Sequence, residues 1–357
     1  MGGRGTLGHV PAIFGGPEIM KTNQATRRLG RHGPEVSPLG LGCMGISDVY
    51  GPADERESLA TIHAALEAGL TLLDTGDFYG MGHNELLLRE ALKGGKRQHV
   101  FLQVKFGAQR DPAGAFIGFD ARPASVKAAL AYTLRRLGTD YVDLYQPARL
   151  DPAVPIEDTV GAIADCVRAG YVRHIGLSEM GAGTIRRAHA VHPIIAVQIE
   201  YSLMSRSLEA EVLPAVRALG LGVTAYGVLS RGLLGSARRQ LPGPGDLRGH
   251  FPRFQGDNLQ HNLSLVQALR DIAQEKGVTI AQLAIAWVLS RGTDIVPVVG
   301  ARTREQLRES LGALEVTLGT EELDRVGRAV PADRVVGTRY GPVQMAMLDS
   351  ERPTPQA

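Results

Sequence analysis

An alternation of short apolar runs with amphipathic segments continues through most of this chain and constrains its fold more than any other feature. We expect strands at 39–43, 70–74, 99–105, 141–146, 172–178, 194–200, 222–227 and 294–299. Helices are expected between them, as at 57–69, where Leu59, Ile62 and Leu66 recur at helical spacing before Gly69. Strands that alternate with helices pair in parallel, with the helices outside the sheet.

Eight such units in a chain of 357 residues favour an α/β protein with a closed (β/α)8 TIM barrel over an open, doubly wound sheet. The glycine-rich segment 40–45, GLGCMG, has the wrong spacing for the phosphate-binding fingerprint of an open sheet. A small N-terminal hairpin is expected around 26–40, with its turn at Gly33-Pro34. A long loop of about thirty residues follows the seventh strand, and its length favours a functional role.

The composition and the chain ends indicate the domain bounds, the class of partner and the compartment to expect. We expect a disordered extension at 1–19, one barrel domain at 20–348 and a tail at 349–357. A net charge of +2 gives no electrostatic reason to expect nucleic acid or a membrane surface as partner. Two distant cysteines, Cys43 and Cys166, exclude a disulfide framework and a cysteine-rich metal site, so we expect a cytoplasmic protein without a metal.

Polar side chains stand where the expected strands end, which is the edge that carries the chemistry of such barrels. Asp74 ends the second strand, Tyr79 follows it, and Lys105 ends the apolar third strand. A buried ammonium needs a counter-charge, and Asp74 supplies one. A free phenol, with a pKa of about 10, is a poor acid at neutral pH, and a neighbouring ammonium favours its phenolate. The three residues predict a proton-transfer site, although the Asp–Lys pair alone could merely stabilise the barrel.

The chain resembles the aldo-keto reductases from about residue 20 to 348. The resemblance is carried by LLDTGDFYGMGHNELL at 72–87, VKFG at 104–107, GYVRHIGLSE at 170–179, VQIEYSL at 197–203, TAYGVLSRGLL at 224–234 and IVPVVGARTREQLRESLGAL at 295–314. Within that family the chain looks most like the long-form soluble branch of aldehyde and perakine reductases. The resemblance implies NADPH-dependent reduction of a small-molecule aldehyde or ketone, with Tyr79 as general acid, Lys105 as its activator and Asp74 as the partner of Lys105. Whether the chain forms a homo-oligomer is left open.

The resemblance also implies a set of NADP(H)-binding residues. Ser178 and Gln198 would hold the nicotinamide carboxamide, and Tyr226 would stack on the ring. Residues Leu229, Ser230 and Gly232 would cradle the pyrophosphate, while the segment after strand eight, with Gly300, Arg302, Gln306 and Glu309, would hold the adenosine end. A guanidinium at Arg302 suits a 2′-phosphate, which favours NADP(H) over NAD(H).

The sequence departs from the family pattern at one position next to the expected chemistry. The segment LYQPARLD at 144–151 has Ala148 where the family usually has a histidine that donates to the substrate carbonyl. Three explanations stay open: a roomier carbonyl pocket, a substitute donor such as His83 or Arg149, or an NADP(H)-binding regulator with little turnover. Arg149 is expected to face away from Ala148 if the strand continues. An isomerase or aldolase that forms a Schiff base on Lys105 is a further alternative.

Overall fold

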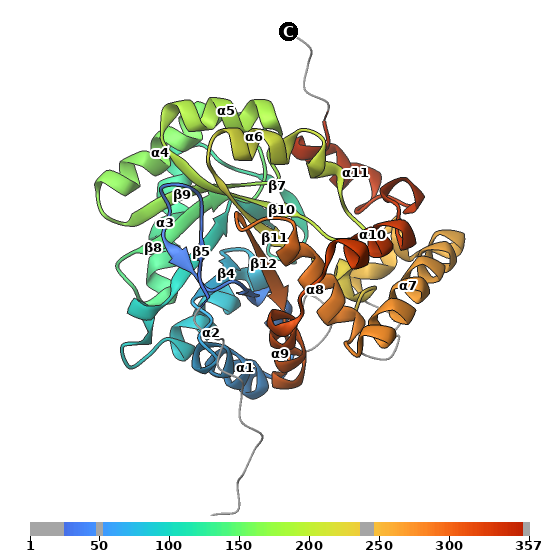
Figure 1. The fold of residues 1–357 in the computed structure, drawn as a ribbon. Coiled ribbons are helices and arrows are strands. Elements are labelled where there is room, and N and C mark those ends of the chain that lie inside the picture. Colours follow the sequence, from blue (N-terminus) through green and yellow to red (C-terminus); the bar gives the residue numbers. More distant parts are fainter. Residues whose placement is uncertain (1–24, 48–52, 236–245, 353–357) are drawn as a thin grey trace, which may run out of the picture.

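The computed structural model describes residues 25–47, 53–235 and 246–352 (Figure 1). The expected extension at 1–19 lies outside the described residues. Figure 1 shows strands at the centre of the molecule with helices around them, as the alternating sequence pattern predicts. Within the described residues, no helix combines the length and the apolar character needed to cross a membrane.

Eight parallel strands form a closed barrel, so the predicted fold class is confirmed. The strands are β3 (Gly40–Gly42), β4 (Leu72–Gly76), β5 (Phe101–Phe106), β8 (Val142–Pro147), β9 (Val172–Ser178), β10 (Ile194–Glu200), β11 (Gly222–Tyr226) and β12 (Ile295–Gly300). Each strand pairs with the next in chain order, and β12 closes the barrel on β3. The expected strands at 172–178 and 194–200 match β9 and β10 residue for residue.

Helices surround the barrel, and most of them bury apolar residues against it. They are α1 (Glu55–Glu67), α2 (His83–Ala91), α3 (Pro123–Leu137), α4 (Ile156–Arg168), α5 (Ala182–Val191), α6 (Val212–Ala218), α7 (Gly256–Lys276), α8 (Ile280–Ser290), α9 (Arg304–Leu311), α10 (Thr320–Ala329) and α11 (Pro342–Ala346). The main core lies between this layer and the outer faces of the strands.

The predicted N-terminal hairpin, β1 (Arg27–Arg28) with β2 (Glu35–Val36), packs against the end of the barrel where the strands begin. Its Leu29 and Val36 form a second apolar cluster with barrel-lining side chains that include Leu72, Phe101 and Leu144. The hairpin and these side chains together form an apolar layer that fills the barrel interior at the end where the strands begin. The polar side chains at 74, 103, 105 and 146 follow further along the same strands.

Two parts of the chain differ from the expectation. The loop after β5 contains an antiparallel hairpin, β6 (Ala108–Arg110) with β7 (Phe116–Phe119), which the sequence did not indicate. The expected tail begins at 349, but Asp349–Glu351 form a short helical turn packed against the barrel. Ser350 and Glu351 hydrogen-bond to buried charged groups, and these contacts explain why the chain is held there.

The close packing of the N-terminal hairpin against β10 can be tested by substitution. Gly30 has φ of +78°, and a Cβ there would lie 2.4 Å from the carbonyl oxygen of Ile195. Gly94 has φ of +71° but nothing within 4 Å of such a Cβ. We expect Gly30→Ala to lower the free energy of unfolding by about 2 kcal/mol more than Gly94→Ala, because only the former adds overpacking to left-handed strain. Equal losses in urea unfolding would contradict the close approach.

Candidate active site

The three residues predicted to transfer a proton lie together inside the barrel. Asp74 is on β4, and Lys105 is on the adjacent β5, where it is in register with Gly76. The Lys105 Nζ donates to both carboxylate oxygens of Asp74, at 2.7 and 2.8 Å. Tyr79 begins a short helical turn, η2 (Tyr79–Gly82), and the Lys105 Nζ lies 5.1 Å from the centre of its ring.

Because both residues are buried, each charge depends on the other for its stabilisation. Lys105 and Asp74 are each 4% exposed. Burial lowers the pKa of Lys105, and the carboxylate of Asp74 opposes that shift. Two amides complete the surroundings of Asp74, with Gln198 Nε2 at 2.8 Å and Gln103 Nε2 at 3.1 Å from Oδ1. The carboxylate is therefore held by donors from three further positions on two other strands.

The residues predicted to hold a nicotinamide stand on adjoining strands. Ser178 ends β9, is buried, and its hydroxyl has no hydrogen-bond partner among the described residues. Gln198 is paired in register with Ser178, but its amide nitrogen serves Asp74. The Tyr226 hydroxyl donates to Glu179 at 2.7 Å and lies 3.3 Å from the hydroxyl of Tyr340. The cofactor contacts of these residues stay predictions.

The expected pyrophosphate segment forms a strained turn after β11. Ser230 and Arg231 have φ of +47° and +54°, in the left-handed region that L-residues rarely adopt. The amides of Ser230 and Gly232 donate to the carbonyls of Gly227 and Leu229, so these two groups stabilise the turn itself. A cradle for phosphate at this turn stays a prediction.

The expected adenosine residues lie at the end of β12 and on α9. Gly300 is the exposed last residue of β12, and the Arg302 amide donates to the side chain of Gln306 at 2.8 Å. Gln306 and Glu309 both belong to α9. The structure thus groups all four residues at one strand end, in the short connection that holds Arg302, and on the helix that follows.

The position of the missing histidine is part of the barrel wall. Ala148 is buried, and its amide donates to the Phe106 carbonyl at 2.8 Å, one residue beyond the end of β8. The chain leaves the strand here, so the alternation argument for Arg149 does not hold. Arg149 instead bonds to the carbonyl of Ala148 at 2.7 Å and lies 3.4 Å from the Tyr340 hydroxyl. The other candidate donor, His83, is exposed, and its Nδ1 lies 3.1 Å from the Ser47 hydroxyl.

A buried charge cluster at the ends of β9 and β10 was not predicted. Arg339 donates to Glu179 and Glu200 and also binds Glu351. Arg231 reaches the same Glu200 from the strained turn, at 3.1 Å. The carboxylates at the strand ends are visible in the sequence, but Arg339 follows no strand or helix pattern that would have marked it.

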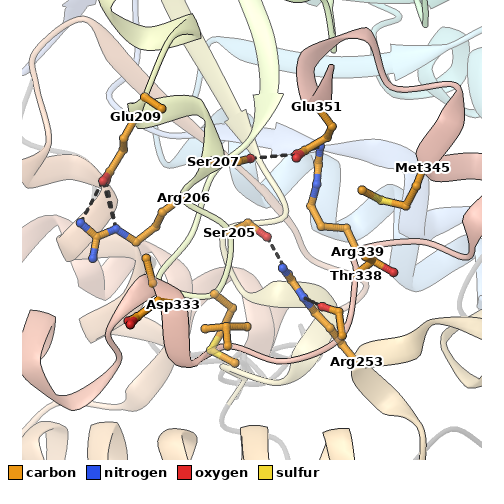
Figure 2. A pocket seen from close by; sticks show the side chains of 15 residues that line it. Ser205, Arg206, Ser207, Glu209, Arg253, Asp333, Thr338, Arg339, Met345 and Glu351 are labelled. Atoms are coloured by element: carbon orange, nitrogen blue, oxygen red, sulfur yellow. Dashed lines mark hydrogen bonds and ion pairs between the residues drawn. The ribbon is translucent and has the colours of Figure 1, made fainter. Parts of the chain in front are cut away.

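A cavity of about 700 Å³ lies beside this cluster (Figure 2). Its wall includes Ser205, Arg253, Arg339 and Glu351 and lacks Asp74, Tyr79 and Lys105. Figure 2 shows the Arg253 guanidinium directed to the Ser205 hydroxyl, at 2.6 Å. Positive and negative side chains line this cavity together. The proton-transfer residues belong to a separate part of the structure.

A further carboxyl group connects the Tyr79 turn to the end of β5. The Asp77 amide donates to the Lys105 carbonyl at 2.9 Å. Burial, with a smaller contribution from the charge of Glu85, raises the pKa of Asp77 to about 7, and Arg136 opposes the shift. Asp77 thus ties the segment that carries Tyr79 to the strand that carries Lys105.

The sequence of this chain is similar to those of known enzymes. The sequence profile of the Aldo/keto reductase family matches residues 38–330. A probable aldo-keto reductase 1 from Glycine max is 42% identical over 317 residues, which cover 88% of this chain and 91% of that protein.

Two solved structures have the same fold. A glycerol dehydrogenase from Gluconobacter oxydans gives a TM-score of 0.77 at 27% identity, covering 93% of this chain and 98% of that one. An aldo-keto reductase from Bacillus halodurans, in its holo form, gives 0.71 at 29% identity, covering 88% and 97%.

Asp77 predicts a pH dependence of stability. Its pKa is raised from 3.8 to about 7, so between these values the folded chain keeps a proton that the unfolded chain has released. Its contribution to stability is therefore complete below about pH 4 and is lost as the pH rises through 7. Asn cannot titrate but keeps an oxygen acceptor. In urea unfolding, the free energy of unfolding of Asp77→Asn should rise relative to that of the unmodified protein between pH 5 and pH 8.

The control is Asp140→Asn, at an exposed position. Its free energy of unfolding relative to the unmodified protein should show no such trend. A difference for Asp77→Asn that does not change with pH would refute the raised pKa of Asp77.

Proposed function

The chain belongs to the aldo/keto reductase family, and we propose that it uses NADPH to reduce an aldehyde or ketone, with Tyr79 as the proton donor. The family as a whole carries out NAD(P)H-dependent reduction of carbonyl groups. The observation that carries the proposal is the buried Lys105–Asp74 pair, whose ammonium lies 5.1 Å from the ring centre of Tyr79. An ammonium fixed beside a phenol stabilises the phenolate that remains after proton donation.

Several residues fit a bound NADPH, which would supply the hydride for carbonyl reduction. The buried Ser178 hydroxyl has no hydrogen-bond partner among the described residues, and it would form a hydrogen bond with the carboxamide. Arg302, with Gln306 and Glu309 beside it, would bind the adenosine end, and its guanidinium would pair with the 2′-phosphate. Tyr226 would lie against the ring, with its hydroxyl anchored by Glu179.

The chain's own part in the reaction is to move one proton. Tyr79 would donate its hydroxyl proton to the carbonyl oxygen as charge develops there. Lys105 would stabilise the resulting phenolate, and Asp74 keeps Lys105 charged and fixed despite its burial. Gln198 and Gln103 hold Asp74 in position, so the orientation of the ammonium also depends on these two amides.

An NADP(H)-binding regulator with little or no turnover is the second candidate. It is favoured by Ala148, whose methyl group offers no hydrogen bond to a carbonyl oxygen. An assay of NADPH oxidation over a panel of aldehydes and ketones separates the two functions. Cofactor that binds and is never oxidised would support the regulator.

We further propose that the barrel domain extends over residues 20–348 and that the protein acts in the cytoplasm on a small-molecule carbonyl. Both cysteines of the chain, Cys43 and Cys166, are buried and unpaired, which suits a reducing compartment.

Removing the Tyr79 hydroxyl tests the proton-transfer role. Tyr79→Phe should lower kcat by at least about 10²-fold, the lower end of what general acid catalysis contributes. NADPH affinity, measured by fluorescence titration, should stay unchanged because the ring remains. The exposed Tyr132 provides a matched control, and Tyr132→Phe should leave kcat unaltered. Full activity in Tyr79→Phe would reject the assignment.

Removing the Arg302 guanidinium tests the choice of cofactor. Arg302→Ala should weaken NADPH binding by about 10- to 100-fold, as expected for a lost charge-assisted hydrogen bond, and NADH binding much less. The neighbouring Arg304 is already paired with Glu57 at 2.9 Å, so Arg304→Ala serves as control and should affect neither cofactor. An equal loss for both cofactors in Arg302→Ala would show that Arg302 does not read the 2′-phosphate.

A further inference from the structure

Arg231 occupies a strained backbone position in the turn after β11. Its φ is +54°, and that of the preceding Ser230 is +47°. Nowhere else in the described part of the chain do two consecutive residues other than glycine have positive φ. The left-handed conformation is unfavourable for such residues, so it persists only where the surroundings fix it, and it is concentrated at functional sites.

The Arg231 guanidinium joins this turn to two segments that lie elsewhere in the sequence. It lies 4.3 Å from the ring centre of Tyr340 in the C-terminal segment and 4.4 Å from that of Phe251 in the long loop. Its Nη1 donates to the carbonyl oxygen of Arg339 at 2.8 Å, and its Nη2 donates to Glu200 at 3.1 Å. The side chain is only 10% exposed. These four contacts hold a planar charged group in one place, and the backbone that carries it is fixed with it.

The C-terminal segment that receives Arg231 is itself anchored to the barrel. Arg339 donates to Glu179, directly after β9, at 2.9 Å. The hydroxyl of Tyr340 lies 3.3 Å from that of Tyr226, the residue proposed to lie against the nicotinamide ring. Arg231 is therefore held by a segment that is bonded to the barrel and that also contacts the expected ring site.

We propose that Arg231 is a positioning residue that holds the turn at 229–232, through the C-terminal segment, in the shape that receives the pyrophosphate of NADPH. The inference rests on the proposed function, because it takes this turn as the pyrophosphate site. The guanidinium stays with the protein groups around it, and no covalent bond forms or breaks. A turn that already has its bound shape loses less conformational freedom when the ligand binds, and the affinity is higher for that reason.

The first experiment compares Arg231→Ala with Arg231→Gly, with the Kd for NADPH measured by fluorescence titration. Both variants lose the side-chain contacts, but only glycine adopts positive φ without strain. Arg231→Ala should raise the Kd about tenfold or more, and Arg231→Gly should raise it at least about threefold less than Arg231→Ala does. A smaller rise for Arg231→Ala, or equal Kd values for the two variants, would overturn the proposal. Arg231→Lys replaces Arg231→Ala if that variant does not fold, because an ammonium does not reproduce the planar contacts.

A smaller ligand gives a readout that a general loss of structure would not spare. Adenosine 2′-phosphate has neither the pyrophosphate nor the nicotinamide, so its binding depends on the Arg302 end of the site. Its Kd should stay within about twofold of the unmodified value in Arg231→Ala, and kcat at saturating NADPH within about threefold, because Tyr79 and Lys105 are unchanged. If adenosine 2′-phosphate loses as much affinity as NADPH does, the whole site is disturbed and the specific role of Arg231 is refuted.

The matched control is Arg253→Ala. Arg253 also joins the long loop to the C-terminal segment, since its Nε donates to the Gly337 carbonyl at 3.1 Å and its Nη1 to the Ser205 hydroxyl at 2.6 Å. Among the described residues it makes no hydrogen bond or ion pair with the turn at 229–232. Arg253→Ala should lower the melting temperature but leave the Kd for NADPH within about twofold. A rise in Kd equal to that of Arg231→Ala would overturn the proposal.

Failure of the proposed function is distinguishable from failure of this inference. It would appear in the unmodified protein as NADPH that is bound but never oxidised, and the comparison of Kd values would still decide the role of Arg231. An unmodified protein that binds no NADPH would overturn both.

Discussion

The ion pair between Lys105 and Asp74 is the interaction on which the candidate site depends. Two unlike charges have been removed from water, and each is stable there only because the other is within hydrogen-bond distance. Removing one partner of such a pair typically costs about 3–5 kcal/mol, because the remaining charge is left buried and uncompensated. The barrel provides the geometry, since neighbouring parallel strands bring positions 74 and 105 side by side. Gln103 and Gln198 then hold the carboxylate in one orientation.

A second group of buried charges fixes the opposite part of the barrel mouth. Glu179 directly follows β9, Glu200 ends the adjacent β10, and Arg339 from the C-terminal segment binds both. Arg339 lowers the pKa of Glu179, although burial alone would raise it, so the carboxylate stays ionised and keeps its hydrogen bond from Tyr226. A residue expected to face the cofactor is thereby positioned by the last described segment of the chain. This explains why residues 349–351 are packed rather than extended as a tail.

The accuracy of the sequence predictions follows the physics of each element. The strand at 194–200 was placed correctly because it is buried along its whole length and begins as a continuous apolar run. The strand at 172–178 was also placed correctly, although it carries Arg173 and His174 between its apolar residues. The hairpin of β6 and β7 was missed because its side chains are largely exposed and carry no alternation of apolar and polar residues. The prediction that Arg149 faces away from Ala148 assumed that the strand continues, but β8 ends at Pro147, so the two-residue period does not apply there.

The order of apolar runs and glycine stops by itself determined the closed barrel, and the residue types at the strand ends determined that Asp74, Tyr79 and Lys105 would face one another. These features are local, since a strand's period and its terminal residue can be read from a few neighbours. Only the tertiary structure decided which buried polar groups lack a hydrogen bond among the described residues, as for Ser178 and Gln146, and which distant residue completes a site, as Arg339 does. Hydrogen-bond partners depend on distances between segments far apart in the chain, and sequence spacing does not encode those distances.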